Sequence, residues 1–181
     1  DAALRRFYLA VLLDERIMWP FFTGKASHQY HHHYTGGLLE HSHEVAMTAS
    51  ALCMQHQVGP VSTSVAFIGG LLHDIGKIHL FYNNTSGNGV VGQHESFNFM
   101  VLAEPLARLS QEAPKLFEAI GSCLSIKIGR QSEAYLPAQM VHICDRLSMD
   151  VHNWRRAFTE VPAYYWFVKS PYGDQVYKRL G

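Results

Sequence analysis

Residues 65–72 read VAFIGGLL, an apolar run without a charged side chain. Thr63 or Ser64 can cap a helix at the start of this run. A helix that is apolar on every side has to be covered by neighbouring elements. The run leads directly into His73 and Asp74, so we expect a buried helix that holds an imidazole and a carboxylate at its end.

Most other segments of the chain also carry apolar residues at helical spacing. The predicted helices cover 2–18 with an end near Pro20, 38–57, 63–76, 96–110, 114–126, 133–152 with Pro137 displacing its start, and 154–168 as a further candidate. No series of hairpins and no alternation of strands with helices occurs in the sequence. We therefore predict an all-α fold, a compact bundle of about six to eight helices.

The charge balance excludes one class of nucleic-acid binder. The 15 lysines and arginines equal the 15 aspartates and glutamates, so no bulk basic field attracts nucleic acid non-specifically. The three cysteines form no CxxC pair, which favours a reducing compartment and argues against a thiolate zinc site. No signal peptide and no apolar window long enough for a membrane occur, so we expect a cytoplasmic protein without a membrane partner.

With 181 residues, the chain is expected to form a single domain over residues 1–181 without disulfides. It begins with Asp1 rather than methionine, which suggests a fragment of a longer polypeptide with additional domains.

Twelve histidines are the compositional oddity, because histidine is a common metal ligand as well as an acid or base. His41 and Asp145 each lie among apolar residues at helical spacing. With His73 and Asp74 they offer four ligands on three helices, which can converge inside a bundle. This set suits Mn²⁺, Fe²⁺, Co²⁺, Ni²⁺, Mg²⁺ or Zn²⁺ without choosing among them. Such an ion lowers the pKa of a bound water, polarises a phosphoryl oxygen, or does both.

Two plainer interpretations stay open at this point. His41 and Asp145 can be hydrogen-bonded polar groups of an ordinary core. The histidine excess can also be a bias of the solvated surface.

The segments GLLEH, LLHDIGK and CDRL resemble the HD superfamily of metal-dependent phosphohydrolases. The likeness covers residues 25–152 and implies an all-α fold that holds a divalent metal. By position, the implied metal ligands are His41, His73, Asp74 and Asp145. Lys77 lies beside them and is expected to hold a substrate phosphate as a point charge, so Asp74 and Lys77 are candidate catalytic residues.

The run KASHQYHHHYTGGLLEHSHEVA is similar to two groups within that superfamily. One is the HD-type relaxases of conjugative elements. The other is a family of bacterial 3′-to-5′ exoribonucleases, whose likeness continues around His94, His142 and Asp145. Both groups act on nucleic-acid phosphodiesters, which implies a nucleic-acid or nucleotide substrate. His31 or His32 is then expected to bind a phosphate, act as general acid or reach a second metal.

The chain departs from two-metal members of the superfamily at Ile126 and Lys127, where a His-His pair is expected. His94 remains a candidate ligand of a second metal, but its expected partner is missing from the sequence. We therefore expect a single metal first. A separate hypothesis is that Lys127 or Arg130 replaces the second cation electrostatically.

The sequence also predicts roles or exposure for other residues near the ligands. His142 lies one turn before Asp145 and is expected to line the site or to hydrogen-bond a ligand. Glu44, one turn after His41, is a candidate for orienting an imidazole or a water, whereas His43 is expected to be exposed. The aromatic segment AYYWFV near the C-terminus is expected to pack.

These inferences lead to three functional hypotheses. The first is a metal-dependent hydrolase in which activated water attacks a phosphoester, with nucleic acid or nucleotide as substrate. The second is a degenerate, non-catalytic HD module that binds a nucleotide or nucleic acid, favoured by the missing histidine pair. The third is a relaxase that nicks one DNA strand. Sequence motifs of other hydrolases and of nucleotide-binding loops are not convincing in this chain.

Overall fold

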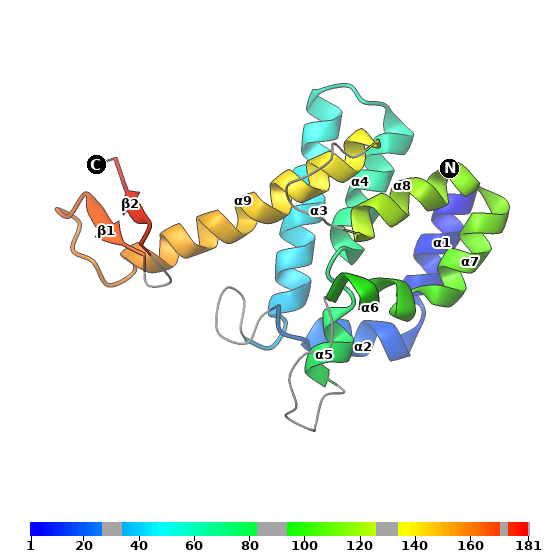
Figure 1. The fold of residues 1–181 in the computed structure, drawn as a ribbon, viewed down its shortest axis with the longest axis horizontal. Coiled ribbons are helices and arrows are strands. Elements are labelled where there is room, and N and C mark those ends of the chain that lie inside the picture. Colours follow the sequence, from blue (N-terminus) through cyan, green and yellow to red (C-terminus); the bar gives the residue numbers. More distant parts are fainter. Residues whose placement is uncertain (27–33, 83–93, 126–133, 171–173, 181) are drawn as a thin grey trace.

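The computed structural model describes residues 1–26, 34–82, 94–125, 134–170 and 174–180. Its elements are α1 (Ala2–Leu12), α2 (Glu15–Thr23), α3 (Gly37–Gln55), α4 (Pro60–Leu72), α5 (Lys77–Tyr82), α6 (His94–Val101), α7 (Ala103–Glu112), α8 (Pro114–Leu124), α9 (Leu136–Phe158), β1 (Phe167–Lys169) and β2 (Val176–Lys178). The predicted all-α class is confirmed, with one small hairpin added. Figure 1 shows the helical bundle at one end and the hairpin at the other, joined by α9.

The apolar run of α4 lies at the centre of the bundle, as predicted. Every residue from Val65 to Leu72 is buried except Phe67, which is partly exposed. Two glycines allow close helix approach here: a Cβ on Gly70 would lie 2.8 Å from the Cα of Ala46 on α3. Helices α3 and α4 therefore pack nearly backbone against backbone, and α3 and α9 are further neighbours in the bundle.

The N-terminal helix that the pattern predicts over 2–18 is two helices. The side chain of Asp14 caps α2 by accepting a hydrogen bond from the backbone N–H of Arg16 at 2.9 Å, and this cap ends the first helix early. Pro20 does not end α2, which continues to Thr23 without the one backbone hydrogen bond that proline cannot donate.

The start of α4 also differs from the prediction. The helix begins at Pro60, because proline has no N–H to leave unpaired in the first turn. The hydroxyls of Thr63 and Ser64 do not cap the helix; they donate to the carbonyl oxygens of Gly59 and Pro60, at 2.9 Å in each case.

The segment predicted as one helix over 96–110 is divided between α6 and α7 at Leu102. The reverse holds at the C-terminal end, where the helix predicted at 133–152 continues through the start of the segment predicted at 154–168 to form the single helix α9. The rest of that segment, 159–168, is not helical, and its last two residues belong to β1. Pro137 lies in its first turn, as expected. The helix ends before Pro162, and the chain continues into the antiparallel hairpin of β1 and β2.

The aromatic residues before and in β1 are exposed, so the expectation that they pack is wrong. Tyr164 is 80% exposed and Trp166 57% exposed. Two three-residue strands bury one face against α9, and there Tyr177 joins Ala157 and Phe158 in a small cluster separate from the main core.

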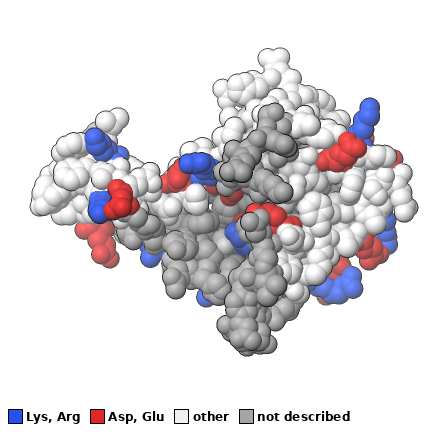
Figure 2. All heavy atoms as spheres, viewed as in Figure 1, with Lys and Arg blue, Asp and Glu red and all other residues white. Residues whose placement is uncertain are grey.

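The visible surface has mixed charge. Figure 2 shows positive and negative side chains interspersed on this face, in line with the balanced totals. Within the part of the chain that the structure describes, no helix combines the length and the apolarity that crossing a bilayer requires.

Candidate metal centre

Three helices bring the four predicted ligands together. His41 lies in the second turn of α3, His73 and Asp74 follow the last residue of α4, and Asp145 lies near the middle of α9. Both histidines are fully buried and Asp74 is 2% exposed. The side chain of Asp145 is 24% exposed, so it marks the more open side of the cluster.

The donor atoms converge on a common point. Nε2 of His41 lies 3.0 Å from Oδ1 of Asp145 and 3.5 Å from Oδ2 of Asp74. Nε2 of His73 lies 3.4 Å and 3.5 Å from the same two oxygens. Among the described residues, His41, His73 and Asp145 form a group whose ligand atoms all lie within 4.8 Å of one another.

A backbone carbonyl sets the tautomer of His73. Nδ1 of this ring lies 2.7 Å from the carbonyl oxygen of Gly70, one turn earlier in α4. Because a carbonyl only accepts, Nδ1 carries the proton and donates it. The lone pair of a neutral His73 is therefore on Nε2, the atom that faces the carboxylates.

A serine and a glutamate do the same for His41. The hydroxyl of Ser148 donates to Oε2 of Glu44 at 2.8 Å, which uses its one proton. Its oxygen, 3.2 Å from Nδ1 of His41, is left to accept from that nitrogen. Nε2 of His41 then also presents a lone pair toward the cluster. Glu44 holds the Ser148 hydroxyl, and Ser148 in turn contacts His41. This geometry agrees with the expectation that Glu44 orients an imidazole.

The Nε2 lone pairs of the two histidines and the two carboxylates repel one another, so a positive charge has to lie between them. A proton on an imidazole or a divalent metal can supply it. Burial disfavours the imidazolium form of His41, but hydrogen bonds to Asp145 and Asp74 outweigh it and raise the pKa of His41 to about 9. Burial likewise disfavours the charged form of Asp145, but hydrogen bonds from His41 and His73 lower the pKa of this carboxyl below its ordinary range. Two imidazole nitrogens with carboxylate oxygens are also a donor set that divalent metals accept, so the residues fit such an ion.

Lys77 belongs to the same cluster. Its Nζ lies 2.5 Å from Oδ2 of Asp74, and its side chain is 13% exposed. The lysine therefore adds one positive charge directly beside the candidate ligands.

Asn98 on α6 holds the backbone turn that carries His73 and Asp74. This fully buried side chain accepts from the backbone N–H of Gly76 at 2.6 Å and donates to the carbonyl oxygens of His73 and Leu124. Neither Asn98 nor Ser148 was singled out from the sequence. Ser148 had a usable signal, because it lies one turn after Asp145 and shares its helix face.

Several of the other predicted site residues lie outside the described part of the chain, and the rest are not among the converging ligands. His31, His32, Ile126, Lys127 and Arg130 lie outside the described residues. His94 begins α6, and its side chain is likewise outside what the structure describes. His142 is partly buried on α9 but is not one of the converging ligands, and His43 is exposed, as predicted.

The fold and the cluster define an all-α protein with a buried site of histidines and aspartates suited to a divalent metal. The sequence matches the HD domain family over residues 38–150, more than half of the chain, and the protein belongs to that family. The family implies a metal-dependent phosphohydrolase and a phosphoester substrate. No curated protein and no solved structure matches the chain.

Proposed function

We propose that the protein hydrolyses phosphodiester bonds of nucleic acid or nucleotides, with one divalent metal held by His41, His73, Asp74 and Asp145. The observation that carries this proposal is the convergence of both Nε2 atoms on the two carboxylates, with each Nδ1 bonded on the far side of its ring. A histidine that only stabilises a core has no need for this arrangement.

The chemistry divides between the ion and the chain. When bound, a divalent ion supplies a Lewis acid that activates water and polarises a phosphoryl oxygen. Asp145 is the most exposed of the four ligands, so the substrate phosphate approaches on its side. Lys77 stabilises the negative charge of that phosphate from beside Asp74. His31 or His32 completes the proposal as a phosphate contact or general acid.

The substrate class rests on the resemblance of the histidine-rich run to HD-type relaxases and exoribonucleases. Both groups act on nucleic-acid phosphodiesters. Nicking of supercoiled plasmid separates the relaxase form of the proposal from an exonuclease or nucleotide hydrolase.

The test is hydrolysis of bis-p-nitrophenyl phosphate by protein stripped with a chelator and then supplied with each candidate ion. We expect turnover that depends on the added ion in the unaltered protein and is lost in His73→Ala and Asp74→Ala. His56→Ala is the matched control, because His56 is exposed at the far end of α3. Equal turnover in chelator, or none with any ion, overturns the proposal; nucleotide binding without turnover supports the non-catalytic module instead.

A further inference from the structure

A groove of about 620 Å³ lies between α3 and α9, one hydrogen bond away from the candidate ligand His41. Its inner end includes Ser148 and Glu44, the pair that orients His41. Its outer end includes Arg155 and Arg156, in the last turns of α9. The groove therefore leads from a side chain that bonds a candidate metal ligand to two cations.

The groove residues of α9 continue the helix face that carries Asp145. Ser148, His152, Arg155 and Arg156 follow Asp145 at intervals of three or four residues, apart from the final adjacent pair, so they lie along one side of the helix. At 1.5 Å per residue, Arg155 lies about 15 Å further along the helix axis than Asp145. A substrate that reaches both ends has to be longer than a single phosphoester group.

The two walls of the groove differ in charge. Arg155 is exposed and has no ion pair within the described part of the chain, and its guanidinium suits a phosphate oxygen pair. On the α3 wall, Glu40 and Glu44 accept hydrogen bonds from the hydroxyls of Tyr34 and Ser148. These carboxylates repel a phosphate but accept from amino or sugar hydroxyl groups. The α9 wall is thus the phosphate side and the α3 wall the base and sugar side.

Resting on the proposed function, we infer that this groove binds the nucleotide next to the scissile phosphate of a single-stranded oligonucleotide, with Arg155 and Arg156 holding the adjoining phosphates. The volume of about 620 Å³ is typical of pockets for one small ligand, so it accepts a nucleotide unit. The substrate is an oligonucleotide rather than a mononucleotide.

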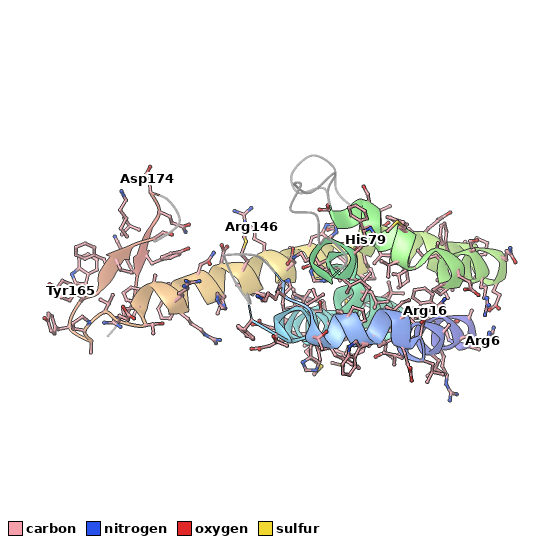
Figure 3. All side chains as sticks on the ribbon, turned by 90° about the horizontal axis from the view of Figure 1, so that it is seen from below. Arg6, Arg16, His79, Arg146, Tyr165 and Asp174 are labelled. Atoms are coloured by element: carbon pink, nitrogen blue, oxygen red, sulfur yellow. The ribbon has the colours of Figure 1, made fainter. Side chains whose placement is uncertain are left out.

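The test compares two adjacent arginine pairs. Arg155→Ala/Arg156→Ala removes the cations of the groove, and Arg5→Ala/Arg6→Ala removes an exposed pair on α1 as a matched control. Figure 3 shows Arg6 at the end of the molecule opposite the hairpin. Binding of fluorescein-labelled oligothymidylate and oligouridylate is measured by anisotropy in chelator across a salt series, so the reading does not depend on catalysis.

We expect the groove variant to weaken binding by at least about tenfold and to reduce the salt slope by about 1.4, the value for two phosphate contacts on a single strand. The control variant binds like the unaltered protein, and the two oligonucleotides show whether DNA or RNA is preferred. Hydrolysis of bis-p-nitrophenyl phosphate, which has one phosphate, is expected to be unchanged in the groove variant.

Equal loss of oligonucleotide binding in both variants, or no loss in either, overturns the inference. If binding depends on Arg155 and Arg156 but neither the unaltered protein nor the variants hydrolyse the phosphodiester, the proposed function is wrong. The assignment of the groove as an oligonucleotide site is then retained.

Discussion

At the scale of single residues, the strongest feature is that both candidate histidine ligands have their Nδ1 atoms bonded. His73 uses a carbonyl of its own helix, whereas His41 depends on a side chain 3.2 Å away on α9. Only the contact of His41 can be removed by substituting a side chain, because the partner of His73 is a backbone carbonyl. Ser148 is therefore the residue at which the orientation of a ligand can be tested.

We predict that Ser148→Ala weakens metal binding by about 10- to 100-fold, the usual effect of losing a partner that orients a ligand. The hydroxyl that fixes the Nδ1 proton of His41 is lost while all four ligands remain. Isothermal titration with Mn²⁺ measures the affinity. Ser64→Ala is the control, because its exposed hydroxyl bonds only the backbone of α4; equal affinity of Ser148→Ala and the unaltered protein contradicts the role of Ser148.

The metal-free protein is predicted to lose stability as pH rises from 6.5 through about 9. His41 has an ordinary pKa of 6.5 and a folded pKa of about 9, so its contribution is complete below 6.5 and is lost above 9. The pKa of Asp145 is lowered from 3.8, so its contribution is present above that value and is lost only in stronger acid. Melting temperatures in chelator across this range measure the effect.

The variant His41→Gln is the control for the pH series, because glutamine does not titrate. Its melting temperature is expected to change less between pH 6.5 and 9 than that of the unaltered protein. Parallel curves for the two proteins are incompatible with a raised pKa at His41. Since a metal displaces the same proton, metal affinity is expected to rise over this range.

At the scale of elements, the close contact of α3 with α4 places His41 beside His73. A Cβ on Gly70 would lie 2.8 Å from the Cα and 3.0 Å from the N of Ala46, both backbone atoms. A methyl group there forces the helices apart. The same glycine supplies the carbonyl that accepts from His73, so the displacement reaches the ligand directly.

Gly70→Ala is predicted to lower stability by roughly 1–3 kcal/mol, the usual cost of overpacking, and to weaken metal binding as well. Gly121→Ala on α8 is the control, because its added Cβ would meet only the Phe99 ring, at an ordinary 3.8 Å. Alanine favours a helix over glycine, so this control is expected to be neutral or stabilising. Thermal unfolding and Mn²⁺ titration of both variants check the prediction, which fails if the two alanines behave alike.

The sequence predicted the long elements better than the breaks between elements. Helical periodicity identified α3 and the buried α4, and the resemblance to the HD superfamily implied the ligands His41, His73 and Asp145, which converge in the structure. The separate helix α2 depends on one Asp14 hydrogen bond, whose contribution of about 1 kcal/mol leaves the periodicity almost unchanged. The hairpin was missed because three-residue strands are too short to display an alternating pattern.

Buried polar connections were the other part that the pattern could not supply. Asn98 joins the turn after α4 to the end of α8, and nothing in its local sequence indicates which backbone groups it bonds. Such contacts follow from tertiary packing rather than from spacing along one helix.

At the scale of the whole molecule, α9 connects two separate hydrophobic clusters. Its first half contributes Ala138, Val141 and Cys144 to the main core, whereas its end contributes Ala157 and Phe158 to the cluster with β2. Figure 3 shows Tyr165, beyond the end of α9, far from the helices that carry Arg6 and Arg16. The metal centre belongs to the first half.

A chain that stops after Thr159 is predicted to keep the bundle and its metal site. No residue beyond Cys144 belongs to the buried set of the main core, so the melting temperature is expected to change by less than about 5 °C. Circular dichroism melting and metal titration of the shortened chain check this. Loss of cooperative unfolding shows instead that the hairpin supports the bundle.

The central claim is that His41, His73, Asp74 and Asp145 hold a divalent metal. Its most direct test is the metal content of purified protein, measured by inductively coupled plasma mass spectrometry after incubation with Mn²⁺, Fe²⁺, Co²⁺, Ni²⁺, Mg²⁺ or Zn²⁺ and removal of free ion. The structure predicts about one tightly held ion per chain in the unaltered protein and almost none in His73→Ala that remains folded. Equal metal content in the two proteins, or none in either, contradicts the account.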